Sequence, residues 1–153
     1  MNIDILKSDF NKTIAPWIGK TSKMMDVYIS DVLSHNNITI TKQQWIVLKI
    51  LFENPEGIIQ NKLAFITDRN KASLTRLING MERNKLVKRI SSKEDSRKNI
   101  VYNTQKGNEL FLKTKPIMLK SISKIQKGIT EDEMNNFIQI MSKIQENLSN
   151  QSF

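Results

Sequence analysis

The chain contains no cysteine and only one histidine, His35, among its 153 residues. The absence of cysteine excludes disulfide bonds, thiolate zinc sites and cysteine nucleophiles. A single histidine disfavours a histidine-rich metal site, so we expect neither a metal ion nor a cofactor. The five glycines are scattered and form neither a phosphate-binding loop nor a dinucleotide fingerprint. The sequence therefore predicts that the chain is not an enzyme.

Long hydrophobic stretches are also missing. The longest one, Trp45 to Phe52, is interrupted by Lys49 and is too short to span a bilayer. The first ten residues carry two acids and no sustained apolar run, unlike a signal peptide. We therefore expect a cytoplasmic protein without a membrane partner. An apolar content of 39% is typical of an ordinary globular protein.

Positive charge is concentrated in the middle of the chain. The formal net charge is +9, and the segment from Ile58 to Thr104 holds eleven basic and four acidic residues, which is +7 of that total. Such a concentration favours a polyanionic partner, whose binding would depend on counterion release and weaken with salt. The alternative is a basic surface that only contacts solvent.

Apolar residues at three- and four-residue steps predict a mainly helical chain. A first helix is expected from Pro16 to about Leu33. The stretch from Thr41 to Gln44 has the pattern of a capping box and begins a second helix that ends near Glu53. A short third helix is expected over residues 60–66, with its buried side formed by Leu63, Ala64 and Ile66.

The second half of the chain continues the pattern. Asn70 is expected to cap a helix over residues 71–84, whose apolar stripe is Leu74, Leu77, Ile78 and Met81. Two β-prone runs, 86–91 and 99–103, flank a charged hairpin tip. Thr104 and a second capping box at 130–133 begin the last two helices. This order predicts a winged helix-turn-helix, mainly α with a small β-wing.

The helix over residues 71–84 has an unusual polar face. This face carries no acid and combines small polar residues with arginines: Arg69, Lys71, Ala72, Ser73, Thr75, Arg76, Asn79 and Arg83. Small side chains allow close approach to base edges, and arginine and asparagine supply paired hydrogen bonds to guanine and adenine. We interpret this helix as a DNA recognition helix. The alternative is an ordinary solvent-exposed amphipathic helix.

The hairpin tip is a second candidate DNA contact. Its candidate residues are Lys93, Asp95, Arg97 and Lys98. A basic β-tip beside a recognition helix can reach a narrow A·T-rich minor groove, which attracts arginine. We expect Asp95 to pair with Arg97 and to fix the direction of its guanidinium. The alternative is a loop that is merely exposed.

These residues resemble the MarR family of bacterial regulators (multiple antibiotic resistance regulator). The stretch 71–78 is similar to the family's recognition helix, and 86–89 follows where its first wing strand should be. Asp95-Ser96-Arg97 matches its D-x-R wing signature, and residues 104–107 match its T-x-x-G motif. Two departures are Lys85, where the family often has glycine, and Asn103, where it usually has leucine. We therefore expect Asn84 to take the left-handed conformation that ends the helix.

The resemblance implies a homodimer bound to a palindromic DNA operator. The implied segments are an N-terminal dimerisation helix (1–36), a winged helix-turn-helix module (37–104) and C-terminal dimerisation helices (105–153). Both terminal segments carry apolar residues that a small central domain could not bury alone, which favours a two-fold dimer. Half-sites would lie about 10 base pairs apart. The implied activity is that of a transcriptional repressor.

Family members commonly have a pocket for a small-molecule effector between the dimer arms and the DNA-binding module. Here its candidate residues are Trp17, Met24, Met25, Tyr28 and Trp45. The alternative is that these residues are core, as methionines and aromatics at helical spacing usually are. An alternative function for the whole chain is a winged-helix module that binds RNA or an acidic protein, and a salt series on duplex DNA and single-stranded RNA would discriminate the two.

Overall fold

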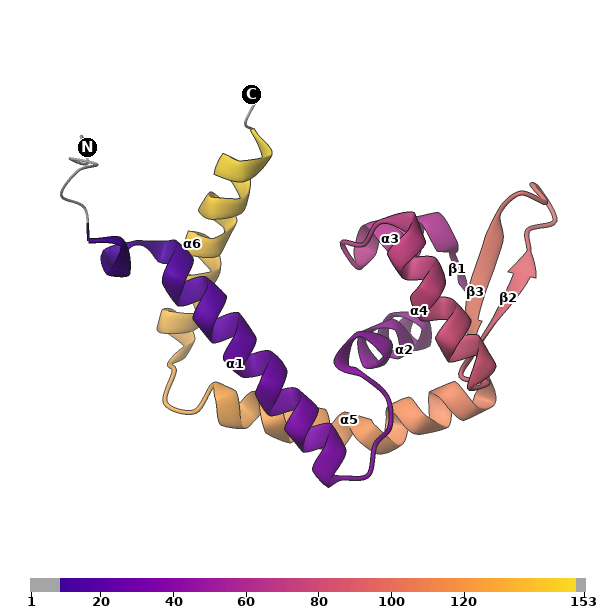
Figure 1. Ribbon diagram of the computed structural model, residues 1–153, viewed down its shortest axis with the longest axis horizontal. Coiled ribbons are helices and arrows are strands. Elements are labelled where there is room, and N and C mark those ends of the chain that lie inside the picture. The colour runs from indigo at the N-terminus through magenta and orange to yellow at the C-terminus, as the bar shows by residue number, and fades with distance from the viewer. Residues whose placement is uncertain (1–8, 151–153) are drawn as a thin grey trace. The chain divides into compact units, whose positions relative to one another are not determined.

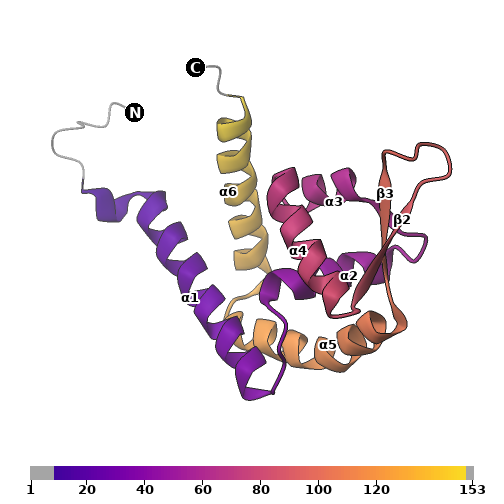
Figure 2. The same cartoon turned by 45° about the vertical axis from the view of Figure 1, so that its right-hand side comes forward.

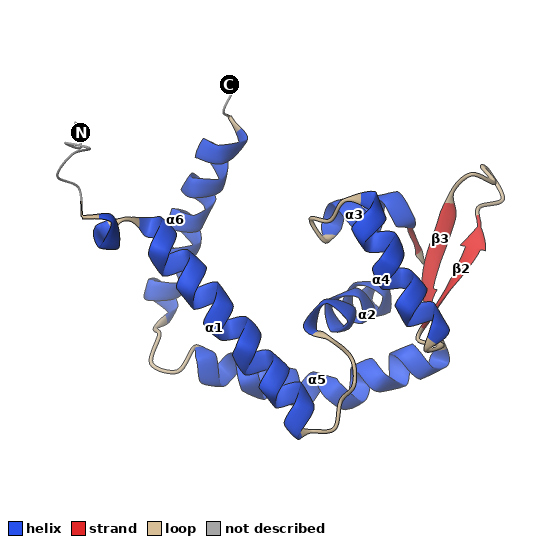
Figure 3. Cartoon of the chain, viewed as in Figure 1, coloured by secondary structure: helices blue, strands red, loops and turns tan. Residues whose placement is uncertain are grey.

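The computed structural model describes residues 9–150, which are mostly helical (Figure 1; Figure 3). After a short 3-10 turn at Phe10–Lys12, the elements are α1 (Ile14–His35), α2 (Lys42–Glu53), β1 (Ile58–Ile59), α3 (Gln60–Ile66), α4 (Lys71–Arg83), β2 (Val87–Ser91), β3 (Asn99–Asn103), α5 (Gln105–Ile125) and α6 (Glu131–Ser149). The chain divides after Leu119 into two compact units, and the boundary falls inside α5. Among residues 9–150, no helix is long and apolar enough to cross a membrane.

Both predicted capping boxes are present. At the start of α2, Thr41 Oγ1 accepts from Gln44 N at 3.2 Å, and Thr41 N donates to Gln44 Oε1 at 3.0 Å. At the start of α6, Thr130 Oγ1 accepts from Glu133 N at 3.2 Å, and Thr130 N donates to Glu133 Oε2 at 2.8 Å. This backbone donor, with the Thr130 hydroxyl, lowers the pKa of Glu133. Local sequence alone therefore determines where these two helices begin.

The start of α1 differs from the prediction. The helix begins at Ile14, so that Pro16 is its third residue and not its first. The first backbone N–H groups of a helix have no partner inside the helix, so a proline in the first turn removes no hydrogen bond. The predicted start at Pro16 was wrong by two residues for this reason.

The sheet has three antiparallel strands in the order β1-β3-β2. The hairpin of β2 and β3 pairs Val87 with Asn103 and Ser91 with Asn99, as the two predicted β-prone runs require. The sequence did not predict β1, which pairs Ile58 with Val101. Its backbone hydrogen bonds join the start of α3 to the base of the wing.

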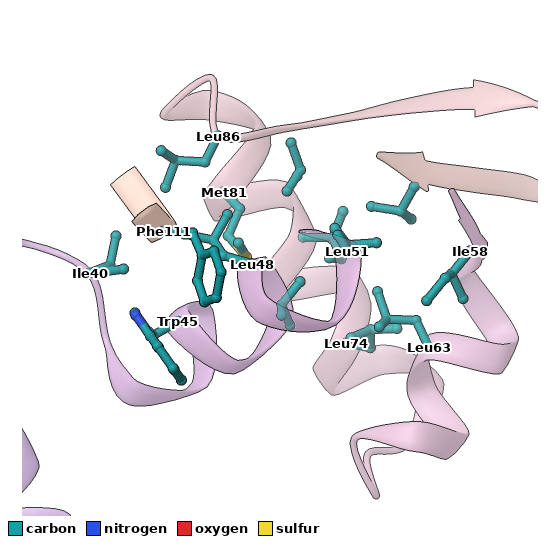
Figure 4. Close-up of a cluster of buried hydrophobic side chains, with 14 of the residues drawn as sticks. Ile40, Trp45, Leu48, Leu51, Ile58, Leu63, Leu74, Met81, Leu86 and Phe111 are labelled. Atoms are coloured by element: carbon teal, nitrogen blue, oxygen red, sulfur yellow. The ribbon is translucent and has the colours of Figure 1, made fainter. Parts of the chain in front are cut away.

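One hydrophobic core holds α2, α3, α4 and the first part of α5 against the sheet (Figure 4). The apolar side chains without solvent exposure are Val47, Leu48, Leu63, Leu74, Ile78, Met81 and Val101. The ring centroid of Phe111 in α5 lies 5.4 Å from that of Trp45 and 4.8 Å from that of Phe52. Fully burying one side chain of leucine size contributes roughly 1.5–3 kcal/mol, so this cluster fixes the relative positions of α3 and α4.

The buried side of α3 is narrower than predicted. Leu63 and Ala64 are buried, but Ile66 is 45% exposed. At 100° per residue, Ile66 lies well to one side of the arc that Leu63 and Ala64 share, and α3 ends at this residue. The prediction that Ile66 points inward was therefore wrong.

The end of α4 also differs from the prediction. Lys85 takes the left-handed conformation with φ 59°, whereas Asn84 has φ −82°. Glycine takes this conformation without a steric penalty, whereas a lysine side chain is unfavourable for it. Lys106 Nζ donates to the carbonyl of Asn84 at 3.0 Å. The expectation that Asn84 would be left-handed was wrong.

The base of the wing is tied to α5 by a close junction. Thr104 N donates to Leu86 O at 3.0 Å, and Thr104 Oγ1 accepts from Gly107 N at 3.1 Å. A Cβ on Gly107 would lie 2.1 Å from the same Leu86 oxygen. Position 107 therefore requires glycine because the backbones of the wing strand and the helix are in direct contact.

Candidate nucleic-acid interface

The predicted recognition helix begins where the sequence indicated. Asn70 Oδ1 accepts from Ser73 N at 2.8 Å and caps α4. Leu74, Ile78 and Met81 are fully buried, and Leu77 packs against the same core. The apolar stripe thus holds α4 against α2 and α3, and the opposite side of the helix is left uncovered. Figure 2 shows α4 in front of α2, with the β2–β3 hairpin beside it.

The polar face of α4 is accessible. Lys71, Ala72, Arg76 and Arg83 are exposed, while the other predicted residues (Arg69, Ser73, Thr75 and Asn79) are half-buried. Within residues 9–150, neither Arg76 nor Arg83 forms an ion pair. Their guanidinium groups remain available to an external anion or base.

Three of the half-buried residues are held by hydrogen bonds to neighbours. Arg69 Nη1 donates to Ser73 Oγ at 2.8 Å, which fixes Arg69 over the first turn of α4. Thr75 Oγ1 donates to Lys71 O at 2.8 Å and accepts from Gln60 Nε2 at 3.1 Å. The start of α3 is thereby tied to the middle of α4. Sequence reasoning did not select Gln60, because this contact depends on how the two helices pack.

A second missed group joins α4 to the wing. Arg89 Nη2 of β2 donates to Asn79 Oδ1 at 2.7 Å and to Glu82 Oε2 at 2.7 Å. Hydrogen bonding to Arg89 is the main reason that the pKa of Glu82 is lowered, and the charge of Arg89 lowers it further. The only signals in the sequence were that Asn79 and Glu82 are three residues apart on one helix and that a charged residue stands in a short strand.

The wing tip matches the prediction for Asp95. Its Oδ1 accepts from Arg97 Nε at 3.2 Å and from Arg97 N at 3.1 Å, and Lys98 Nζ lies 3.8 Å from Oδ2. The Arg97 side chain is nevertheless 90% exposed. Asp95 therefore orients this arginine without covering it, and Lys93 is exposed on the same tip.

A small hollow lies between α4 and the wing. Its volume is about 240 Å³, and its lining includes Gln60, Lys71, Arg97 and Lys98. It brings together three cations from segments far apart in the sequence. Three cations of the basic segment 58–104 thus share one local surface, which suits a polyanion.

The predicted effector residues are spread over α1 and the core. Trp45 is buried, and its Nε1 donates to Thr114 Oγ1 of α5 at 2.8 Å. Tyr28 is half-buried against the core. The other three residues lie exposed on α1: Trp17, Met24 and Met25. Cavities of about 240, 280 and 640 Å³ within residues 9–150 are lined by other residues.

Comparison with known proteins also indicates a DNA-binding protein. The MarR family model matches residues 40–98, which contain α2, the helix pair α3–α4 and most of the wing. The chain thus contains a MarR family domain over these residues. It is a DNA-binding transcriptional regulator with a winged helix fold, and the resemblance found in the sequence is confirmed.

The individual proteins that resemble this chain are distant in sequence. The homoprotocatechuate degradative operon repressor of Escherichia coli is 26% identical over 116 residues, which are 76% of each chain. A MarR family transcriptional regulator from Listeria monocytogenes, solved in complex with 26mer DNA, is 28% identical with a TM-score of 0.76 and covers 90% of this chain and 89% of its own.

A third relative shares the fold at lower identity. The S. aureus MepR–DNA complex has a TM-score of 0.81 at 21% identity and covers 88% of this chain and 98% of its own. The family whose model matches residues 40–98 consists of transcriptional regulators.

Proposed function

We propose that this regulator binds a palindromic duplex operator as a homodimer, with α4 of each protomer in a major groove and the wing in the adjacent minor groove. The observation that carries the proposal is the accessible, acid-free face of α4, on which Arg76 and Arg83 have no ion-pair partner within the described residues. Arginine reads the two acceptors of guanine in the major groove, and the small neighbours Ala72 and Ser73 allow close approach.

The wing residues support a second contact on the same duplex. Lys93, Arg97 and Lys98 are exposed at the hairpin tip, and Asp95 holds the guanidinium of Arg97 in one direction. An oriented arginine suits the narrow minor groove of an A·T-rich flank. The hollow that joins Lys71 to Arg97 and Lys98 would then face the phosphate ridge between the two grooves.

Homodimerisation is supported by the apolar side chains that α1 and α6 leave exposed. On α1, Trp17 is 66% and Met24 61% exposed, and α6 has no buried residue at all. Apolar faces of this extent are covered in stable proteins, and a two-fold dimer covers both copies at once. The dimerisation segments remain those proposed from the sequence, residues 1–36 and 105–153.

The cellular role that we propose is repression of transcription in the cytoplasm, without catalytic activity. The E. coli relative is named as an operon repressor, which supports this role. Release from DNA would require a small molecule that favours a different spacing of the two α4 helices. Trp17, Met24, Met25, Tyr28 and Trp45 remain the proposed effector residues.

The test is the effect of Arg76→Ala on sequence preference. On an operator mapped by footprinting, this variant should lose about 1–3 kcal/mol of binding free energy, with a much smaller loss on random duplex. Lys62→Ala, which removes an exposed cation from α3, is the matched control and should weaken both duplexes alike. An equal loss on both duplexes for Arg76→Ala would contradict base reading by this residue. Tighter binding to single-stranded RNA than to duplex DNA would favour the alternative function.

A further inference from the structure

The side chain of Asn79 lies between the polar face of α4 and strand β2 of the wing. Its Oδ1 accepts a hydrogen bond from Arg89 Nη2 at 2.7 Å. A guanidinium group carries only donors, so the atom of the Asn79 amide that faces Arg89 must be the oxygen. Arg89 thereby determines which end of this amide points away from the wing.

Arg89 is itself held in place. The same Nη2 donates to Glu82 Oε2 at 2.7 Å, and the backbone N–H of Arg89 donates to Glu82 Oε1 at 3.3 Å. The Arg89 side chain is only 23% exposed. Charge-assisted hydrogen bonds of this kind are short and directional, so the Glu82–Arg89 pair forms a fixed support for Asn79.

We propose that Asn79 reads DNA only as a hydrogen-bond donor, because Arg89 holds its oxygen toward the wing and leaves the NH2 group to face the base. The proposal rests on the proposed function, in which α4 enters the major groove. Asn79 Nδ2 forms no hydrogen bond within residues 9–150, so its two N–H groups are available to a base. Asn79 is then a specificity-determining residue, and Arg89 is a positioning residue that acts through it.

The chemistry of the base edges gives this proposal a definite consequence. An unrestrained asparagine reads adenine with two bonds, one accepted from N6 and one donated to N7. Because the Asn79 oxygen is held toward Arg89, it does not face the base together with Nδ2, so Asn79 presents no acceptor to N6. Guanine O6 and thymine O4 are acceptors at the position where adenine N6 and cytosine N4 are amino donors. Asn79 is therefore expected to favour guanine or thymine over adenine or cytosine.

The first experiment locates the base that Asn79 reads. Affinities of the full-length protein for operators with each of the four bases at each position are measured for the wild type and for Asn79→Ala. One position per half-site should lose its preference for guanine or thymine in the variant, with a change of about fivefold or more. If Asn79→Ala alters no base preference, or if the lost preference is for adenine, the proposal is wrong.

The second experiment tests whether Arg89 positions Asn79, by replacing Arg89 with an uncharged residue. Arg89→Met frees the oxygen of Asn79, so adenine at that position should gain about fivefold relative to guanine or thymine. Lys88→Met is the matched control, because Lys88 loses the same charge from the same strand but lies over the Tyr102 ring, 5.7 Å from its centroid. A purely structural role for Arg89 would weaken all sequences alike, and that result would overturn the proposal.

Asn79→Asp gives an independent answer if Arg89→Met does not fold. The carboxylate has the shape of the amide and still accepts from Arg89, but it offers a second acceptor to the DNA in place of a donor. Preference at the same position should move to cytosine or adenine, and an unchanged preference would refute the donor role. The effect of Arg76→Ala on operator preference is measured in the same assay, so failure of the proposed function is separable from failure of this inference.

Discussion

Apolar residues are buried in the winged module but exposed on α6. In the module, Leu48, Leu74 and Ile78 have no solvent exposure, whereas on α6 the side chains of Phe137, Ile138 and Leu148 are more than half exposed. Both regions show the same spacing of apolar residues in the sequence. The module thus provides its own core, while α6 has an apolar face that only another surface can cover. Periodicity predicts a helix and its buried side, but not the partner that buries it.

The largest effect on stability is expected when a cavity is opened in the core of the winged module. Leu48→Ala removes a fully buried side chain beside Phe111 and Met81 (Figure 4) and should lower the free energy of unfolding by about 2–5 kcal/mol. Urea unfolding followed by circular dichroism measures this change. A loss below about 1 kcal/mol would mean that the module is not the self-sufficient core of the chain.

The same contrast predicts a different result on α6. Phe137→Glu changes an exposed residue, so it should affect the fold of one chain little but weaken the dimer by about tenfold or more, as loss of an interface aromatic does. Gln139→Glu adds the same charge on the polar side of α6 and serves as the control. Analytical ultracentrifugation over a range of concentrations measures the dimer dissociation constant. Equal dissociation constants for both variants would show that this face is not in the interface.

Most elements could be predicted from the sequence because their signals are local. The capping boxes at Thr41 and Thr130, the cap at Asn70 and the apolar stripe of α4 depend on residues within a few positions of each other. Strand β1 escaped prediction because two residues carry no alternation, and its pairing with β3 joins residues more than forty positions apart. The left-handed residue was misplaced because propensity favours Asn84, whereas the chain geometry places Lys85 there.

The candidate site divides in the same way. The pairing of Asp95 with Arg97 spans two residues and was predicted correctly, as was the exposed position of Arg76. The support formed by Glu82 and Arg89 was missed, because it exists only when β2 lies beside α4. Local rules thus located the surface of the site, but not the contacts that orient its side chains.

A smaller effect concerns the acid stability of the junction between α4 and the wing. The pKa of Glu82 lies below its ordinary value of 4.5, so the ion pair with Arg89 stabilises the folded state above that pH and is lost as the pH falls through the lowered pKa. Because both side chains are partly exposed, Glu82→Gln should cost no more than about 1 kcal/mol at pH 7.

Urea unfolding at a series of pH values checks this prediction. The stability difference between the wild type and Glu82→Gln should be largest near neutral pH and should disappear at acidic pH, where the wild-type carboxyl is protonated. A difference that stays constant down to strongly acidic pH would show that the charge of Glu82 does not contribute.

An effect of similar size, but a gain in stability, is expected at Lys85. Lys85→Gly replaces a residue with φ 59° by the one that adopts this conformation without steric strain, so the free energy of unfolding should rise by about 1 kcal/mol. Thermal unfolding measures the gain, and Asn84→Gly, at a position with ordinary φ, is the control and should destabilise the protein slightly. A loss of stability in Lys85→Gly would show that the lysine side chain contributes more than the backbone strain costs.

The contact between Gly107 and the carbonyl of Leu86 has a mechanical consequence. Because no side chain separates the two backbones, and Thr104 bonds to both sides of the junction, the first turn of α5 and the root of the hairpin form one stiff piece. Any rotation of that turn displaces the hairpin by a proportional amount. A methyl group at position 107, as in alanine, would push the two backbones apart. It would therefore change the angle between α5 and the hairpin.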